Sequence, residues 1–317
     1  MSYHQLTSGE RYMLSALRRQ GLHQAAIARQ LGRHRSTIGR ELQRNGSRWD
    51  GCYRPSVAIE RTSGRRSRSR RNQRFTRTDL RRVDALLRQQ WSPEQVSGYL
   101  RRHRLLSISH ETIYRHVWRD RRHGGTLYQQ LRGARKQRRK RYGAYDSRGR
   151  LAGKRPITDR PPIVERRGRL GDWEIDTVMG TGSPHCLVTL VERKTGYLLL
   201  GKLEARTQAH LSCQTIRLAR AYAARSHTVT ADNGTEFHDY ASIERALGVR
   251  FYFATPHHAW ERGTSENTNG LVRQYVPKGT SMADLTQPDC AAIAAALNTR
   301  PRKRLDYKTP QECFDAF

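Results

Sequence analysis

The sequence is poor in acidic residues and cysteines, and it contains no long apolar run. Its 317 residues include 28 Asp and Glu against 60 Lys and Arg, a net charge of +32. The five cysteines form no CxxC pair and are odd in number, which argues against a disulfide framework and predicts free thiols in a reducing cytosol. No apolar stretch reaches the roughly 18 residues of a membrane span, and the N-terminus lacks the apolar segment of a signal peptide. We therefore expect a soluble, cytoplasmic protein.

The positive charge is concentrated in the first half of the chain. Residues 1–150 hold 37 Lys and Arg against 10 acidic residues, whereas the remaining residues hold 23 against 18. An arginine-rich excess of this size is typical of a protein that binds a polyanion, and it indicates nucleic acid as the partner. A ribosomal or packaging protein would have a similar isoelectric point, so the charge does not indicate catalysis. The uneven distribution predicts two parts with different roles.

Three short helices are predicted between Thr7 and Arg44, where apolar residues recur at helical spacing in three blocks. Gly32 stands where the end of a helix favours a left-handed residue. This spacing is typical of a helix-turn-helix domain, assigned to residues 1–60, although a plain three-helix unit is the alternative. The recognition helix would direct arginines to phosphates or guanines in a major groove. These candidate DNA contacts are Arg33, Arg35, Arg40 and Arg44.

A second helix-turn-helix domain is predicted over residues 78–131, after a basic linker at 61–77 that has too few apolar side chains to form a core. Its signals include a helix start at Ser92, Pro93 and Gln95, which matches a capping box. The helix in SHETIYRHVWRD follows, with two outward arginines as candidate DNA contacts. They are Arg115 and Arg119. The aromatic residues Trp91 and Trp118 are expected in the core, and a second basic linker is expected at 132–165.

Residues 166–317 are predicted to form a mixed α/β domain. Strands are expected at 172–179, 185–192, 196–203, 227–231 and 249–254, with helices at 207–224, at 240–247 and around Glu266. The order βββαβαβα fits several α/β arrangements, and the positions of the acidic residues favour the ribonuclease H-like one among them. We therefore expect a multidomain protein: two all-α DNA-binding units, then an α/β ribonuclease H-like domain with a mixed five-stranded sheet.

Three acidic residues in this domain stand in different settings. Asp176 lies in the strand GDWEIDTV, Asp232 ends the strand HTVTAD, and Glu266 lies on a helix after 33 intervening residues. A carboxylate in mid-sheet is unfavourable unless it is paired or binds a metal. Two Mg²⁺ ions held roughly 4 Å apart by carboxylates can activate an attacking oxygen and stabilise a leaving oxygen in phosphoryl transfer. The combination therefore predicts a divalent-metal nuclease site.

Each of the three residues also has a structural explanation: a buried salt bridge for Asp176, an Asp-Asn-Gly turn for Asp232 and simple solvation for Glu266. Other acidic residues lie nearby and keep the choice open: Asp172, Glu174, Glu236 and Glu261. Beyond the acids, Arg273 and Lys278 are candidate contacts to DNA phosphates. The pair His257 and His258 has no Cys or His partners at finger spacing, so a structural zinc site is not predicted.

Long motifs in the chain resemble those of a known family. GDWEIDTV, TADNGTEF and HHAWERGTSENTNGLVRQYVPKGT look like the catalytic blocks of the IS-thirty family of insertion-sequence transposases. WSPEQVSGYL with SHETIYRHV resembles the second DNA-binding unit of the same family, so the likeness spans nearly the whole chain. The resemblance implies that Asp176, Asp232 and Glu266 form the catalytic, metal-binding triad of a DDE transposase. It also implies DNA cutting and strand transfer at the terminal inverted repeats of the element.

The resemblance carries expectations about cofactors and partners. The cofactor would be Mg²⁺ or Mn²⁺, as two ions, and the partner would be double-stranded DNA, both the inverted repeats and the target. A homodimer or higher oligomer on DNA and a bacterial, nucleoid-associated location are expected, with no membrane. The main alternative is a sequence-specific transcriptional repressor without catalysis. A recombinase with a covalent tyrosine link and a metal-dependent ribonuclease are lesser alternatives.

Overall fold

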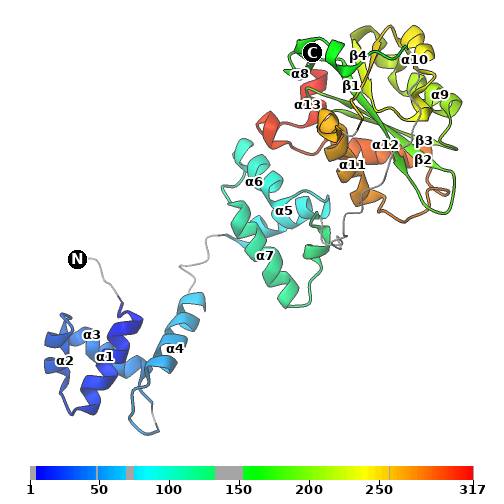
Figure 1. Cartoon of the computed structure of the whole chain (residues 1–317). Helices are drawn as coiled ribbons and strands as arrows, with labels where there is room; N and C mark the ends of the chain where they lie inside the picture. Colours follow the sequence, from blue (N-terminus) through cyan, green and yellow to red (C-terminus); the bar gives the residue numbers. More distant parts are fainter. Residues whose placement is uncertain (1–4, 48, 69–74, 133–152, 257, 317) are drawn as a thin grey trace. The chain divides into compact units, whose positions relative to one another are not determined.

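The computed structural model of the chain describes residues 5–47, 49–68, 75–132, 153–256 and 258–316 (Figure 1). The chain divides into two compact units, Met1–Leu80 and Arg81–Phe317. Over the described ranges, no helix combines the length and apolarity needed to cross a membrane. All five cysteines are free thiols, as predicted.

The first unit contains the predicted helix-turn-helix. Its core is formed by Leu14, Ile27 and Ile38, each at most 1% exposed, together with Tyr53 and Ala58. Gly32 has a φ of +62° directly after the second helix, the left-handed conformation that the sequence predicts there. The helices are α1 (Ser8–Arg19), α2 (Gln24–Gln30), α3 (Arg35–Asn45) and α4 (Pro55–Arg68).

The prediction of a linker at 61–77 is wrong for residues 61–68, because these residues form the last two turns of α4. Arginine has a good helix propensity, and this segment does not need a core of its own because Ala58 anchors α4 in the unit. Arg61 donates to the carbonyl of Asn45 and Arg65 to that of Arg44, so the basic side chains satisfy the C-terminal end of α3. The rest of the linker, 69–74, lies outside the described residues.

The second helix-turn-helix is built from α5 (Arg77–Arg88), α6 (Pro93–Arg102) and α7 (His110–Arg122). Ser92 and Gln95 form the predicted capping box at the start of α6. Trp91 is buried as expected, but the prediction for Trp118 is wrong, because this side chain is 44% exposed. Its neighbour Val117 occupies the buried stripe of α7, and one residue further the helix has turned by about 100°. The basic run at 133–152 is outside the described residues.

The C-terminal part contains the predicted mixed five-stranded sheet, in the order β3-β2-β1-β4-β5. The central strand β1 pairs antiparallel with β2 and parallel with β4, while β5 extends the sheet parallel to β4. Strand positions agree with the sequence prediction to within two residues. They are β1 (Asp172–Met179), β2 (Cys186–Glu192), β3 (Leu198–Leu203), β4 (Thr228–Ala231) and β5 (Arg250–Phe253). This topology is ribonuclease H-like.

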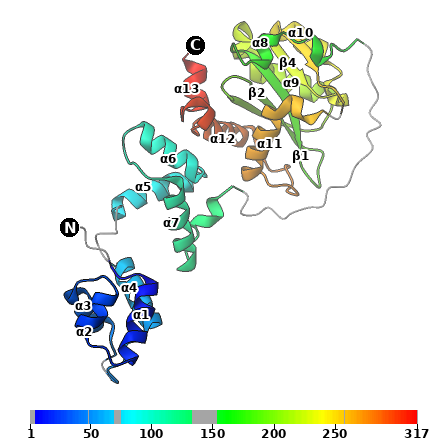
Figure 2. The same ribbon diagram turned by 60° about the vertical axis from the view of Figure 1, so that its left-hand side comes forward.

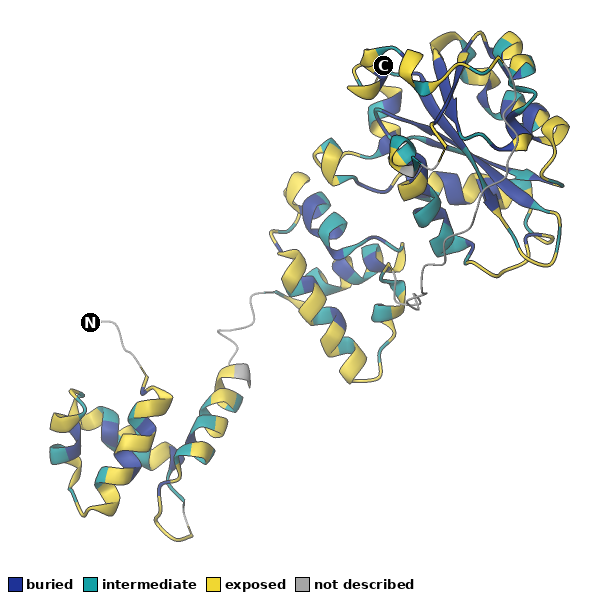
Figure 3. Ribbon diagram, viewed as in Figure 1, coloured by how far each residue is buried: buried dark blue, intermediate teal, exposed yellow. Residues whose placement is uncertain are grey.

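Helices cover both faces of the sheet, whose strands are largely buried (Figures 2 and 3). Trp173 and Ile175 of β1 pack on the side of α9 (Gln208–Ala219) and α10 (Tyr240–Leu247). Val178 points to the other side, where it packs with α11 (Gly263–Tyr275) and α12 (Gln287–Asn298). The predicted helix at 207–224 ends as α-helix at Ala219 and continues as the 3-10 helix η4 (Arg220–Arg225).

The second unit also contains short α-helices and 3-10 helices. These are the helices α8 (Pro162–Glu165) and α13 (Pro310–Asp315) and the 3-10 helices η2 (Leu127–Gln130), η3 (Ile157–Asp159), η5 (Thr235–Phe237), η6 (Ala259–Arg262) and η7 (Lys303–Leu305). Of these, η5 follows the end of β4 and η6 leads directly into α11. Both therefore lie next to candidate site residues.

Candidate active site

Asp176 lies in the middle of the central strand β1, opposite Thr189 of β2. Its side chain is on the α11 side of the sheet and is 21% exposed. Asn269 of α11 donates from Nδ2 to Asp176 Oδ2 at 2.8 Å. Burial raises the pKa of the Asp176 carboxyl, while the nearby Arg262 guanidinium acts in the opposite direction. The sequence prediction that Asp176 lies in the middle of the sheet is confirmed, although its side chain is partly exposed.

Asp232 directly follows β4, the parallel neighbour of β1, so it emerges beside Asp176. Its Oδ1 accepts a hydrogen bond from the Gly234 amide at 2.8 Å, which is the turn that the Asp-Asn-Gly sequence predicts. A Cβ atom at Gly234 would lie 2.8 Å from Asp232 Oδ1 and closer still to Glu236 Oε2. A larger residue here would therefore have to displace one of these carboxylates, and the turn directs Asp232 Oδ2 away from Gly234.

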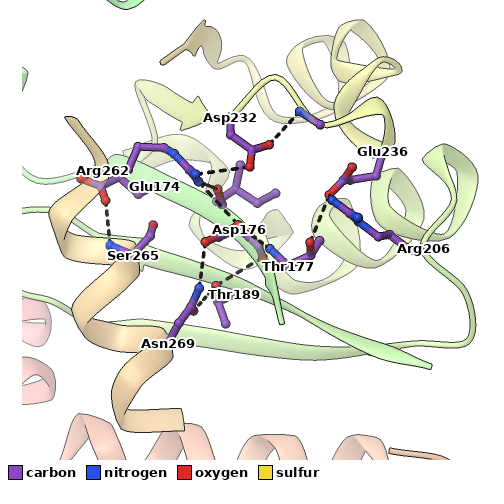
Figure 4. Close-up of polar contacts among 12 residues, drawn as sticks. Glu174, Asp176, Thr177, Thr189, Arg206, Asp232, Glu236, Arg262, Ser265 and Asn269 are labelled. Atoms are coloured by element: carbon purple, nitrogen blue, oxygen red, sulfur yellow. Dashed lines mark hydrogen bonds and ion pairs between the residues drawn. The ribbon is translucent and has the colours of Figure 1, made fainter. Parts of the chain in front are cut away.

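The two aspartates converge on one cation, the guanidinium of Arg262 (Figure 4). Arg262 Nη1 lies 3.5 Å from Asp176 Oδ1, and Nη2 lies 3.3 Å from Asp232 Oδ2. Nη1 also donates to the carbonyl of Ile175 at 3.5 Å. Arg262 is not among the site residues predicted from the sequence. Its position four residues before Glu266, one helical turn away, is the signal that could have drawn attention to it.

Glu266 lies in the first turn of α11 and is exposed. Within the described part of the chain, it forms neither an ion pair nor a hydrogen bond with either aspartate, and no three His, Cys, Asp or Glu side chains are grouped closely enough to hold a metal. Its helix neighbours at i−4 and i+3, Arg262 and Asn269, both contact Asp176. The structure therefore brings Asp176 and Asp232 together and leaves Glu266 near them but separate.

Glu174 is on the same face of β1 as Asp176 but is completely buried and has a structural role. Arg193 Nη1 donates to Glu174 Oε1 at 2.6 Å. The backbone amide of Ser265 donates to Glu174 Oε2 at 2.8 Å, as Figure 4 shows. Ser265 is the third residue of α11, so the carboxylate satisfies one of the amides that a helix leaves unpaired at its N-terminus. Glu174 thereby anchors the start of the helix that carries Glu266.

The other competing acids also have partners. Glu236 is buried and accepts hydrogen bonds from Arg206 and from the Thr177 hydroxyl. Asp172 accepts from Arg169 and Thr228, and Glu261 accepts from the backbone amide of Thr255. These contacts hold the loops and strand ends around the site. Among these described acids, Asp176 and Asp232 are thus the two that share the guanidinium of Arg262.

Comparison with known proteins connects this geometry to a family. Residues 2–45 match a helix-turn-helix domain family. The chain is 38% identical over 314 residues to the transposase for insertion sequence element IS4351 of Bacteroides fragilis, covering 99% of this chain and 96% of that protein. It is 41% identical over 237 residues to the transposase for element IS1086 of Cupriavidus metallidurans, covering 72% and 69%. The chain belongs to the IS30 (IS-thirty) family of insertion-sequence transposases.

A third relative of this transposase agrees with that assignment. Transposase InsI for element IS30A of Escherichia coli is 36% identical over 239 residues, which cover 72% of this chain and 62% of that protein. Among solved structures, the catalytic core domain of BIV integrase is similar to part of this chain. The match covers 46% of this chain and 94% of the integrase chain, with 16% sequence identity and a TM-score of 0.37. The transposase is an enzyme of the DDE polynucleotidyl transferase type, and it acts in DNA transposition.

The predicted DNA contacts of the transposase lie in different surroundings. Arg35, Arg40 and Arg44 of α3 are exposed, whereas Arg33 lies before α3 and is paired with Glu10 of α1 at 2.7 Å. The other four predicted contacts lie on α7 and in the catalytic domain. Arg115 pairs with Glu111, Arg119 is exposed, Arg273 donates to the Met179 carbonyl at 2.7 Å, and Lys278 is exposed. All eight remain predicted DNA contacts.

The Arg33–Glu10 pair predicts a pH dependence for the first unit. The hydrogen bond from Arg33 lowers the pKa of Glu10 from 4.5 to about 2. A carboxylate whose pKa is lower in the folded state than in the unfolded state stabilises the folded protein, and it does so fully at a pH above its unfolded pKa. This contribution of Glu10 is lost as the pH falls from 4.5 toward 2. Arg33→Ala should therefore make the melting temperature of this unit fall less between about pH 5 and pH 2.5.

Calorimetry of the wild type and the variant across this range measures the effect. Arg40→Ala removes an exposed arginine of α3 and serves as the matched control, with a pH profile like that of the wild type. Equal pH profiles for Arg33→Ala and the wild type would exclude a contribution from the pair.

Proposed function

We propose that this transposase binds the terminal inverted repeats of an insertion sequence and catalyses Mg²⁺- or Mn²⁺-dependent cleavage and strand transfer at Asp176, Asp232 and Glu266. The observation that carries the proposal is the convergence of two carboxylates from adjacent strands on one cation. A sheet that places two acids at one position, with a third acid on the helix above, offers the hard oxygen ligands that these metals prefer.

Two carboxylates of the proposed donor set are already placed to hold a divalent metal. Asp176 Oδ1 and Asp232 Oδ2 already attract a positive group, and Glu266 would join them from the first turn of α11. A pair of bound Mg²⁺ ions would act as Lewis acids on the scissile phosphate and on the attacking and leaving oxygens. The protein supplies orientation: Asn269 holds Oδ2 of Asp176, and the Gly234 amide holds Oδ1 of Asp232. Both carboxylates are thus fixed before DNA arrives.

Two phosphoryl transfers follow from this proposal. Water attacks the phosphorus at the transposon end, the bond from phosphorus to the 3′ oxygen breaks, and a 3′-hydroxyl is released. That hydroxyl then attacks a phosphorus of the target DNA and displaces its 3′ oxygen, so one phosphodiester forms as another breaks. No covalent bond to the protein is required at any stage.

The DNA-binding units would hold the inverted repeats in this scheme. The exposed arginines of α3 and α7 would contact phosphates and base edges, and Arg273 and Lys278 would contact phosphates near the catalytic site. Because two transposon ends must meet for joining, we expect a homodimer or higher oligomer on DNA. We also expect the protein to work in the bacterial cytoplasm, associated with the nucleoid.

Labelled DNA from the flanks of the protein's own gene tests the function. The wild type should nick and join this DNA with Mg²⁺ or Mn²⁺ and should bind without cutting in EDTA, because the phosphoryl transfer depends on the metal while DNA binding depends on the basic side chains. Gel electrophoresis of the labelled strands measures nicking and joining, and a mobility shift measures binding.

The alternatives give different results in the same assay. Binding without cutting under every metal condition, even with paired ends, would favour the repressor. A protein–DNA adduct that survives denaturation would indicate a covalent recombinase, and preferential cutting of an RNA of the same sequence would indicate a ribonuclease.

A further inference from the structure

We infer that Arg262 is a positioning residue whose guanidinium occupies the place between Asp176 and Asp232 until a divalent metal displaces it. This inference rests on the proposed function, because it concerns the same two carboxylates. It concerns what the metal-free protein does with them, a role that the sequence motifs do not assign.

The Arg262 guanidinium and a divalent metal would compete for the same carboxylate oxygens. Asn269 donates to Oδ2 of Asp176, and the Gly234 amide donates to Oδ1 of Asp232. The remaining oxygens, Oδ1 of Asp176 and Oδ2 of Asp232, are those that Arg262 contacts. Oδ1 of Asp176 also accepts a hydrogen bond from the Thr177 amide at 2.9 Å, which helps to fix the orientation of this carboxylate. A metal that joins the two aspartates must take the oxygens that Arg262 holds.

The distances indicate a contact that can be exchanged. Charge-assisted hydrogen bonds of a guanidinium to a carboxylate are usually about 2.7–2.9 Å long, whereas the nitrogen–oxygen distances from Arg262 to the two aspartates are 3.3 and 3.5 Å. Mg²⁺ binds carboxylate oxygens at about 2.0–2.1 Å and carries twice the charge. Arg262 therefore neutralises the two carboxylates in the absence of metal without binding them as closely as a metal would.

Arg193 provides the contrast within the same domain. It also bridges two carboxylates, Glu174 at 2.6 Å and Glu165 at 3.2 Å, but its side chain is only 4% exposed. The Arg262 side chain is 14% exposed and lies at the junction of η6 and α11, before the exposed Gly263. Arg193 is thus enclosed as a structural pair, while Arg262 is placed where its side chain can leave.

Without Arg262, two half-buried carboxylates face each other with no cation between them. Their mutual repulsion makes the metal-free state less favourable, and an incoming metal no longer has to displace a guanidinium. Both effects favour metal binding. A purely structural role for Arg262 predicts the opposite, because loss of a structural contact would disorder the carboxylates and weaken the metal site.

Mn²⁺ binding to the full-length chain without DNA tests the inference. Electron paramagnetic resonance of free Mn²⁺ gives the dissociation constant for the wild type, Arg262→Gln, Arg262→Lys and Asp232→Asn. Arg262→Gln should bind Mn²⁺ about tenfold more tightly than the wild type, which corresponds to about 1.4 kcal/mol. Arg262→Lys keeps the charge but loses the forked head, so its affinity should lie between the two. Mn²⁺ should also raise the melting temperature of Arg262→Gln more than that of the wild type.

The control is Arg245→Ala, an exposed arginine of α10 that donates to the Ser242 hydroxyl. It removes one positive charge from the same domain and should leave the Mn²⁺ affinity unchanged. Equal or weaker Mn²⁺ binding by Arg262→Gln, with binding lost in Asp232→Asn, would overturn the role of Arg262 and leave the metal site intact. If neither the wild type nor Arg262→Gln shows binding that depends on Asp232, the proposed metal site fails and this inference fails with it.

Discussion

Asp232→Asn is expected to reduce DNA cleavage by at least about 10³-fold and to leave the affinity for the flanking DNA unchanged. Asparagine has the size of aspartate and keeps an oxygen to accept the Gly234 amide, so the turn after β4 is preserved. The substitution removes one negative charge and weakens a proposed metal ligand, and metal ions supply several kcal/mol of transition-state stabilisation. A loss of about 4 kcal/mol corresponds to a factor of roughly 10³ in rate.

The rate of strand nicking and a mobility shift on the same DNA measure the two properties separately. Asp284→Asn, an exposed acid of the same domain, is the matched control and should cut at the wild-type rate. Glu266→Gln should share the loss of Asp232→Asn if α11 supplies the third ligand. Wild-type nicking by Asp232→Asn, in a preparation free of other nucleases, would remove this residue from the mechanism.

Arg193→Ala is expected to destabilise the catalytic domain by about 3–5 kcal/mol, the usual effect of removing one partner from a buried ion pair. Glu174 is completely buried and the Arg193 side chain is 4% exposed, so the alanine leaves a carboxylate without its cation inside the protein. The same carboxylate accepts the Ser265 amide at the start of α11. Destabilisation should therefore loosen the helix that carries Glu266 as well as the sheet.

Chemical denaturation followed by near-ultraviolet circular dichroism measures the change in the free energy of unfolding. A double variant, Arg193→Met with Glu174→Gln, removes both charges while keeping an acceptor for the Ser265 amide, and it should recover much of the lost stability. The exposed control Arg245→Ala should change the free energy by less than about 0.5 kcal/mol. A loss below about 1 kcal/mol for Arg193→Ala would contradict a role for the pair as an anchor.

The elements that the sequence predicted well have strong local signals. The strand at 172–179 and the helix at 240–247 were placed at their observed ends, because alternation and helical spacing are properties of a few consecutive residues. The capping box at Ser92 and the left-handed Gly32 were also confirmed, and each depends on a few neighbouring residues.

The errors arose where distant contacts decide. Residues 61–68 lack apolar side chains, yet they are helical because Ala58 anchors α4 and the arginines satisfy carbonyls at the end of α3. The sequence predicts Trp118 in the core because it stands at an apolar position of its helix, whereas the packing of α7 exposes it beside Arg121, whose guanidinium lies 5.5 Å from its ring centre. Neither result could be derived from the local pattern alone.

The sequence by itself determined the family, the two DNA-binding units, the order of the strands and the candidate status of Asp176, Asp232 and Glu266. Only the tertiary structure decided that Asp176 and Asp232 share the guanidinium of Arg262, and that Glu174 and Glu236 serve as structural acids. The physical reason is that periodicity and capping act over a few residues, whereas charge pairing depends on which strands and helices pack together. In this transposase, those partners lie 19 to 93 residues apart in the chain.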